Sequence, residues 1–391
     1  MISVEEALDI LKKNVLRSTI EEVDLSQALD LILAEDLTSP INMPPFDNSA
    51  MDGYALNMIQ ASTSFEIIGE IQAGSKGDIT LESNQAVRIF TGALVPKTAN
   101  TVIQQEWAKV EGNQLTFDRE IETNKNIRRE GEQIKAGAVA MKKGQLLNPA
   151  AIGFLAGLGI EKVNVYSSPK VAVYCTGDEL IEAGNTLEPG QIYESNGKML
   201  IASLAKYGFH NTSLHKLPDD FNLTYEALNK GIKENDIVLV SGGISVGDYD
   251  YVGKAFQKIG VEEVFYKVKQ KPGKPLFAGN TKDTFVFGLP GNPASSLSCF
   301  YNFVLPYLNQ FKGGDFKGLK KQNLIFEGEY TKRGERAEFL KAIAEDNAVK
   351  LLGHQSSAML DSFAAANALV YVDKDISSLD NGDVVPVFLI D

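Results

Sequence analysis

Three glycine-rich stretches follow one another within residues 236–297, and this window constrains the fold more than any other part of the chain. The first (SGGISVGDYDY, 241–251) follows the apolar run 237–240, and the third (GLPGNPASS, 288–296) follows the apolar run 285–287. Short apolar runs are typical of buried strands, and strands that end in glycine loops leave an open α/β sheet at its carboxyl edge. Such sheets bind ligands at that edge, so the window predicts a parallel sheet with a ligand site there.

The same loops are suited to binding an anion, because glycine lets backbone N–H groups approach a ligand without a Cβ in the way. The second stretch (KPGKP, 271–275) puts Lys271 and Lys274 on a proline-stiffened loop, and Lys267 and Lys269 lie just upstream. Turn punctuation in an α/β domain is the alternative interpretation, which a single glycine-rich loop would leave open. Three such loops beside strands and lysines favour a phosphate-rich ligand.

Composition narrows the class of protein. A chain of 391 residues with 44% hydrophobic and 23% charged residues is long enough for two to four globular domains. No apolar run approaches the ~20 residues needed to cross a bilayer, and residues 1–6 do not resemble a secretory signal. Cys175 and Cys299 are the only cysteines, which fits a reducing cytoplasm. We therefore expect a soluble cytoplasmic protein.

The net charge of −13 disfavours nucleic acid and anionic membranes as partners. An acidic protein that binds a phosphate-rich ligand needs local lysines or a divalent cation held by carboxylates. The three histidines and two cysteines form no spacing typical of zinc sites.

The periodicity along the chain predicts several domains. We expect helices at 4–13 and 25–34, and short strands between 65 and 137 that form a β-rich domain. From 168 to about 315 strands alternate with helices, which predicts a doubly wound domain of about five strands. Five strands beyond residue 314 predict a C-terminal β-barrel or sandwich, in which we find no chemistry.

Acidic residues occur in several of the loops that follow strands. Carboxylates beside phosphate-binding loops indicate a divalent cation, most often Mg²⁺, and general acid–base chemistry is the alternative. Individual acids can also be helix caps or solvated charges, Asp219 and Asp236 in particular. No Ser-His-Asp or Cys-His pattern is present, so covalent catalysis is not favoured. The acids are Asp52, Glu132, Asp178, Glu179, Asp219, Asp248 and Asp250.

Six motifs, in order, resemble the molybdopterin molybdenumtransferase family of the MoeA and gephyrin E-domain type. The resemblance covers essentially the whole chain, and the first motif is close to diagnostic. The motifs are PFDNSAMDGYA (45–55), RIFTGA (88–93), TGDEL (176–180), the 241–251 loop, KPGKP (271–275) and LPGNP (289–293).

The resemblance implies a homodimer of four-domain subunits with the active site at the subunit interface. An extended, discontinuous domain would comprise residues 1–46 and 138–167, with a β-rich domain (47–137) inserted into it. A MogA-like molybdopterin-binding α/β domain (168–315) and a C-terminal β domain (316–391) would follow. Other molybdenum cofactor biosynthesis proteins are possible partners.

The reaction implied is Mg²⁺-dependent: adenylyl-molybdopterin and molybdate give molybdenum cofactor and AMP. The matching catalytic positions are Asp52, Thr91, Glu179, Asp219 and Asp250, of which Asp52, Glu179 and Asp250 are the implied metal ligands. The matching ligand-binding positions are Gly242, Gly243, Ser245, Gly247, Lys267, Lys271, Lys274, Pro290, Gly291, Asn292 and Pro293.

One position departs from the family. Gly131-Glu132-Gln133 stands where the family often has Gly-Glu-Asp, so either Glu132 replaces the missing acid or the site carries one charge fewer. Two other functions compete with the transferase. One is a non-catalytic protein, either a scaffold like gephyrin or an inactive paralogue that binds molybdopterin. The other is a nucleotide-pyrophosphate hydrolase of the CinA type. The acids at Asp52 and Asp250 favour the enzyme over the scaffold, and the 45–55 motif disfavours the hydrolase.

Overall fold

The computed structural model describes residues 1–390 except 17, 59–61, 77 and 245–250. The chain divides into two compact units. The first comprises Met1–Glu22, Asp30–Ala34 and Asn164–Asp391, and the second comprises Val23–Leu29 and Glu35–Val163. The chain passes between the units after residues 22, 29, 34 and 163, so both units are discontinuous in sequence. The first of these crossings lies in strand β1 (Ile20–Asp24) and the last in β12 (Lys162–Tyr166).

A sheet runs through the first unit in the order β16-β13-β17-β21-β20-β18. Strands β16, β13, β17 and β21 are parallel, whereas β20 and β18 add an antiparallel edge. The doubly wound sheet is thus confirmed, but it has one strand more than predicted. The sequence of β20, FAGN, contains glycine and asparagine, which are depleted in strands. The bounds are β13 Val171–Thr176, β16 Thr212–Leu217, β17 Ile237–Ser241, β18 Glu262–Tyr266, β20 Phe277–Asn280 and β21 Phe285–Leu289.

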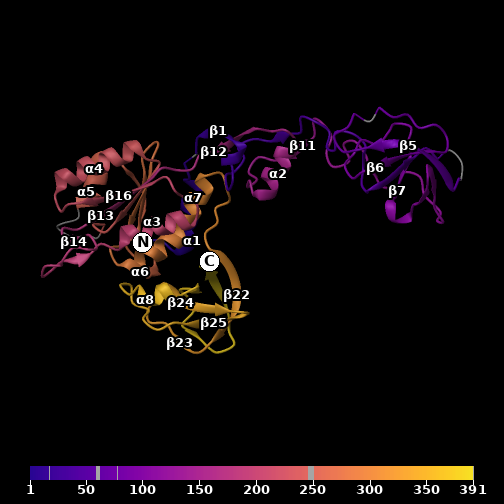
Figure 1. Ribbon diagram of the computed structural model, residues 1–391. Helices are drawn as coiled ribbons and strands as arrows, with labels where there is room; N and C mark the ends of the chain where they lie inside the picture. The colour runs from indigo at the N-terminus through magenta and orange to yellow at the C-terminus, as the bar shows by residue number, and fades with distance from the viewer. Residues whose placement is uncertain (17, 59–61, 77, 245–250, 391) are drawn as a thin grey trace. The chain divides into compact units, whose positions relative to one another are not determined.

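Helices cover both faces of this sheet (Figure 1). The alternation along β13 shows why: Val171 and Val173 pack into the core with α3 and α6, and Ala172 and Tyr174 pack into the core with α4 and α5. In the described part of the chain no helix is both long and apolar enough to cross a membrane. The bounds are α3 Asn196–Lys206, α4 Phe221–Glu234, α5 Tyr251–Ile259 and α6 Pro293–Cys299, which continues through a π-helical turn (Phe300–Val304) into α7 Leu305–Phe311.

The first predicted helix is confirmed and the second is wrong. Helix α1 (Val4–Lys13) begins at a capping box in which Ser3 and Glu6 exchange hydrogen bonds. Residues 25–34 form only a 3-10 turn, Leu25–Gln27, although the apolar residues have helical spacing. Asp30 adopts a left-handed conformation (φ 63°), which ends any helix. Beyond it, Leu33 forms an antiparallel bridge with Val165.

The C-terminal strands of the first unit close into a barrel, as predicted. The pairing runs β24-β25-β22-β28-β26 and returns from β26 to β24. The short strand β19 (Gln270–Lys271), which belongs to the preceding domain, also pairs with β24. The barrel strands are β22 Lys320–Glu327, β24 Ala337–Glu345, β25 Ala348–Leu351, β26 Ala368–Val372 and β28 Val384–Leu389; α8 (Asp361–Ala365), β23 (Tyr330–Thr331) and β27 (Ser378–Leu379) lie in the connections.

The second unit is β-rich, as predicted for residues 65–137. Its largest sheet has the order β7-β4-β6-β5-β9-β8, and Val87, Ile89 and Val102 lie in its core. Helix α2 (Pro149–Gly157) begins at Asn148, whose side chain caps the amide of Ala151. The remaining strands are β2 Leu37–Thr38, β3 Asn48–Ser49, β4 Gly53–Leu56, β5 Ser64–Ile71, β6 Gln85–Ile89, β7 Thr101–Gln104, β8 Lys109–Glu111, β9 Gln114–Thr116, β10 Ile127–Arg128 and β11 Val139–Met141.

Candidate functional site

A cavity of about 520 Å³ lies at the carboxyl edge of the parallel sheet in the first unit. Loops that follow β13, β16, β17 and β21 line it, which is where the glycine-rich stretches predict a ligand site. Seven of the predicted site residues are among those that line it: Glu179, Asp219, Gly242, Gly243, Gly291, Asn292 and Pro293.

Glycines give the cavity its shape. Gly242 has a left-handed backbone (φ 91°), and a Cβ there would lie 2.6 Å from Oγ1 of Thr176. Gly177 (φ 133°) has the Glu179 carboxylate directly over it, since a Cβ at Gly177 would lie 2.3 Å from Oε2. The loop after β13 can therefore place the carboxylate of Glu179 against its own backbone only because residue 177 is glycine.

Two neighbouring loops are joined through their acids. The amide of Asp178 donates to Oδ2 of Asp219, and the amide of Asp219 donates to Oδ1 of Asp178, both at 3.2 Å. Asp219 therefore does not cap α4, which was the alternative interpretation. Its neighbour Asp220 is the N-cap and accepts from the amide of Leu223 at 2.9 Å.

Asn196 is a further residue of the site, and no sequence motif indicated it. Its Nδ2 donates to Oγ of Ser241 (2.9 Å) and to the carbonyl of Gly291 (2.7 Å), so one side chain connects the first and third glycine stretches. Its Oδ1 is buried and has no hydrogen-bond partner in the described structure. A buried amide oxygen without a donor leaves an acceptor available to a ligand. The only sequence signal was its position at the start of a helix.

The C-terminal barrel also contributes to the cavity wall. Ala358 lines the cavity, and the neighbouring Ser357 accepts from Nδ2 of Asn292 (Oγ, 3.0 Å) and from the amide of Ser295 (carbonyl, 3.3 Å). Residues 353–360 carry no motif that would have predicted this.

The predicted lysines do not line the cavity as the structure describes it. Lys271 forms an ion pair with Glu338 of the barrel (Nζ–Oε1, 2.9 Å), Lys267 lies with its Nζ 4.5 Å from the centroid of the Tyr266 ring, and Lys274 is exposed. Pro290 is buried beside the lining residue Gly291. Ser245, Gly247, Asp248 and Asp250 lie outside the described residues.

The acid and the hydroxyl predicted at Asp52 and Thr91 contact each other in the second unit. Oδ1 of Asp52 accepts from the amide (2.8 Å) and the hydroxyl (2.7 Å) of Thr91. These hydrogen bonds, the amide first, lower the pKa of Asp52, and the nearby Arg88 guanidinium adds to the effect. Gly53 follows, where a Cβ would lie 1.7 Å from the carbonyl of Ile103. Asp52 is thus an exposed carboxylate held in its charged form.

Arg129 lies close in sequence to Gly131-Glu132-Gln133, the position that departs from the family, and forms an ion pair. Nη1 of Arg129 pairs with Asp47 at 2.6 Å, and the amide of Arg129 donates to Oε2 of Glu132 at 2.9 Å. Glu132 therefore caps a turn, and Gln133 is exposed beside it. Partly exposed ion pairs such as Arg129–Asp47 contribute little to stability.

Two carboxylates of the cavity, Glu179 and Asp219, could serve as metal ligands. The described residues contain no group of three His, Cys, Asp or Glu side chains close enough to hold a metal ion by themselves. Glu179 and Asp219 share one cavity with backbone amides, and Mg²⁺ is often held by one or two carboxylates together with substrate phosphates. These two residues fit that mode of binding. The buried thiol of Cys175 lines the same cavity, and burial raises its pKa, so it is a poor nucleophile.

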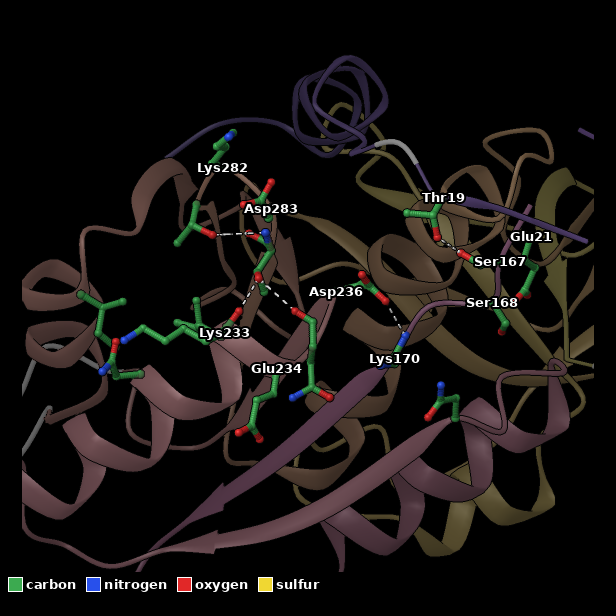
Figure 2. A pocket seen from close by; sticks show the side chains of 17 residues that line it. Thr19, Glu21, Ser167, Ser168, Lys170, Lys233, Glu234, Asp236, Lys282 and Asp283 are labelled. Atoms are coloured by element: carbon green, nitrogen blue, oxygen red, sulfur yellow. Dashed lines mark hydrogen bonds between the residues drawn. The ribbon is translucent and has the colours of Figure 1, made fainter. Parts of the chain in front are cut away.

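A second, larger cavity of about 730 Å³ lies at the opposite, amino edge of the sheet (Figure 2). There Asp236 accepts from the amide of Lys170 (2.8 Å), and the hydroxyl of Thr284 donates to the carbonyls of Ile232 (2.5 Å) and Asn235 (2.9 Å). Asp236 thus joins the starts of two strands, as expected of a structural acid. None of the predicted site residues that the structure describes lines this cavity.

Comparison with known proteins gives matches along the chain. Residues 2–159 match the MoeA N-terminal region (domain I and II), residues 172–310 match a probable molybdopterin binding domain, and residues 323–390 match the MoeA C-terminal region (domain IV).

Full-length relatives and solved structures agree. A protein of Haemophilus influenzae named molybdopterin molybdenumtransferase is 35% identical over 94% of this chain and 93% of its own length. A protein of Staphylococcus epidermidis with the same name is 31% identical over 99% of this chain and 95% of its own length. Two crystal structures of the molybdopterin biosynthesis MoeA protein of Pyrococcus horikoshii have TM-scores of 0.86 and 0.84, at 30% and 31% identity. Each match covers all of this chain. It covers 99% of the first crystal structure's chain and all of the second's.

Proposed function

Because the chain belongs to the MoeA family, whose curated relatives are named molybdopterin molybdenumtransferase, we propose that it inserts molybdate into adenylyl-molybdopterin in a Mg²⁺-dependent reaction that releases AMP. The coarser assignment, a transferase of molybdenum cofactor biosynthesis, follows from the family itself. The metal requirement and the released product are the proposed part.

The cavity at the carboxyl edge is the observation that carries the proposal. It combines the glycine-loop amide of Gly243, the free amide oxygen of Asn196, and the carboxylates of Glu179 and Asp219. Amides suit phosphate oxygens, and a carbonyl oxygen suits an N–H donor on a ring. A ligand with both a phosphate and a heterocycle matches this combination.

Each group has a defined part in the proposal. Asp52, Glu179 and Asp250 are the predicted metal ligands, and Asp219, which shares the cavity with Glu179, would add a carboxylate to them. Mg²⁺ held there would neutralise charge on the ligand's phosphates. Lys267, Lys271 and Lys274 bind the anionic part of the substrates. Thr91 fixes the orientation and charge of Asp52 through its two hydrogen bonds.

We further propose a cytoplasmic homodimer with the active site at the subunit interface, possible contacts with other molybdenum cofactor biosynthesis proteins, and no nucleic-acid or membrane partner. The four domain boundaries implied by the sequence belong to the same proposal. The dimer can be tested by mixing two inactive variants, Asp52→Ala and Asp219→Ala. If each site takes Asp52 from one subunit and Asp219 from the other, mixed dimers contain an intact site and recover activity. No recovery in mixed dimers would contradict a shared site.

Turnover of purified adenylyl-molybdopterin tests the reaction. AMP release is followed with molybdate and Mg²⁺, without molybdate, and with a chelator followed by added Mg²⁺. The proposal expects AMP release that depends on both ions. Release without molybdate would indicate the nucleotide-pyrophosphate hydrolase. Binding without release would indicate the scaffold or an inactive paralogue, with Gln133 as the first residue to change. Replacing molybdate by tungstate then measures metal preference.

A further inference from the structure

Glu338 is a buried carboxylate in the wall of the C-terminal barrel, at 1% exposure. Its Oε1 pairs with Nζ of Lys271 at 2.9 Å, and its Oε2 accepts a hydrogen bond from the hydroxyl of Tyr330. Burial, and then the Glu338 carboxylate, raise the pKa of Tyr330, so this phenol keeps its proton and acts as a donor. Burying a carboxylate is strongly unfavourable unless it is paired and hydrogen-bonded. Both oxygens of Glu338 meet that condition.

The backbone fixes the same pair in register. Strand β19, which contains Lys271, runs parallel to β24 with Lys271 opposite Glu338 and Gln270 opposite Ala337. The amide of Ala337 donates to the carbonyl of Lys269 (3.2 Å), and Nη1 of Arg336 donates to the carbonyl of Gln270 (3.2 Å). The barrel therefore holds both the main chain and the side chain of Lys271.

The other side of the loop is held as tightly. Gly273 has φ 89°, and a Cβ there would lie 2.5 Å from Sγ of Cys299 in α6. Nε2 of Gln270, which is fully buried, donates to the carbonyl of Gly273 at 3.0 Å. Lys271 nevertheless keeps a side chain that is 43% exposed. Its ammonium has three donors, and Glu338 is its one acceptor in the described structure, so two donors remain for an anion.

We propose that Glu338, supported by Tyr330, is a positioning residue that holds the Lys271 ammonium where it binds the anionic substrate. The inference rests on the proposed function, since it takes Lys271 as part of the anion-binding side. It gives the C-terminal barrel a part in the reaction. A four-carbon stem without this anchor samples many rotamers, so fixing it lowers the entropy lost when the anion binds.

A competing role for Glu338 predicts the opposite change in the KM for molybdate. A carboxylate that merely neutralises Lys271 would weaken anion binding, and Glu338→Gln would then lower the KM for molybdate. A positioning carboxylate predicts that the same variant raises this KM about tenfold, the worth of one charge-assisted hydrogen bond, with kcat little changed. Glu345→Gln is the matched control, because it makes the same substitution at an exposed position of the same strand.

A double-mutant cycle shows whether Glu338 acts through Lys271. If it does, Lys271→Gln with Glu338→Gln should be no less active than Lys271→Gln alone. If the fold-loss of activity in the double variant equals the product of the two single-variant losses, the proposal is overturned. Tyr330→Phe removes the second partner of Glu338 while keeping the ion pair, and it should raise the KM by a smaller factor. This variant decides the question if Glu338→Gln fails to fold.

A readout without turnover separates this inference from the proposed function. Competitive labelling of amines, followed peptide by peptide, measures the reactivity of Lys271 in the whole protein. Glu338→Gln should make Lys271 label faster, and Glu345→Gln should not. Equal rates in wild type and Glu338→Gln would overturn the positioning role. If the wild-type protein does not turn over adenylyl-molybdopterin, the proposed function fails, and labelling alone decides whether Glu338 orients Lys271.

Discussion

Oδ1 of Asp52 accepts two hydrogen bonds from the same residue, from the amide of Thr91 at 2.8 Å and from its hydroxyl at 2.7 Å. The amide bond survives any substitution at residue 91, whereas the hydroxyl bond depends on the side chain. The pair therefore allows the contribution of one hydrogen bond to be measured without removing the carboxylate.

Thr91→Val should lower kcat for AMP release by about 10- to 100-fold, because a hydrogen bond to a charged group is worth about 1.5–3 kcal/mol. Thr91→Ser keeps a hydroxyl and serves as the matched control, with most of the activity retained. The measurement is kcat at saturating substrates together with a thermal melt of each variant. Equal losses in the valine and serine variants would show that the hydroxyl contact to Asp52 is not what matters.

Two adjacent acids, Asp219 and Asp220, should separate function from stability. Asp220 caps α4, so Asp220→Ala should lower the free energy of unfolding by about 1 kcal/mol and leave turnover nearly unchanged. Asp219 lines the cavity, and in the described structure its carboxylate accepts only from the amide of Asp178, so Asp219→Ala should abolish most turnover at a small cost in stability. Denaturant unfolding and AMP release are measured on both. The reverse pattern would make Asp219 the structural acid.

Much of this site could be predicted from sequence, since strand-ending glycine loops leave a parallel sheet on a known side. That rule placed Gly242 and Gly291 at one edge of the sheet. It could not predict Asn196, which connects their loops through contacts 45 and 95 residues away in sequence. Nor could it predict that Lys271 would pair with Glu338, because that partner lies 67 residues further along, in a barrel without motifs.

The wrong helix at 25–34 has a comparable cause. Its apolar spacing fits a helix, but Asp30 has a left-handed backbone and Leu33 forms a tertiary bridge with Val165. Local periodicity carries no information about a partner more than 100 residues away. Tertiary contacts of this kind readily override the helix propensity of a short segment.

Two glycines with the same backbone conformation allow a matched test of the cavity. Gly242 and Gly260 both have φ 91°, but a Cβ at Gly242 meets Thr176, whereas a Cβ at Gly260 meets nothing within 4 Å. Alanine at either position should cost about 1–2 kcal/mol of stability through the left-handed backbone. Only Gly242→Ala should also weaken binding of the nucleotide substrate. Calorimetric titration with adenylyl-molybdopterin compares them, and equal affinities in the two variants would place the ligand elsewhere.

Lys341 supports the barrel's part of the cavity wall. This lysine is 3% exposed, and its ammonium donates to the carbonyls of His354 (2.6 Å), Ser356 (3.3 Å) and Met359 (3.0 Å). These acceptors bracket Ser357, which contacts Asn292 at the edge of the cavity. Lys341→Met should therefore release this loop, because three carbonyls lose their shared donor.

The expected result is a loss of about 3 kcal/mol in the free energy of unfolding, together with faster hydrogen exchange at residues 353–360. Lys350→Met is the control, because Lys350 is exposed on the adjacent strand β25. Its stability and exchange should match the wild-type protein within about 0.5 kcal/mol. If Lys341→Met unfolds at the wild-type denaturant concentration and the loop exchanges no faster, then the ammonium does not hold the loop, and Gln355, which also hydrogen-bonds Lys341 and Leu352, carries that role.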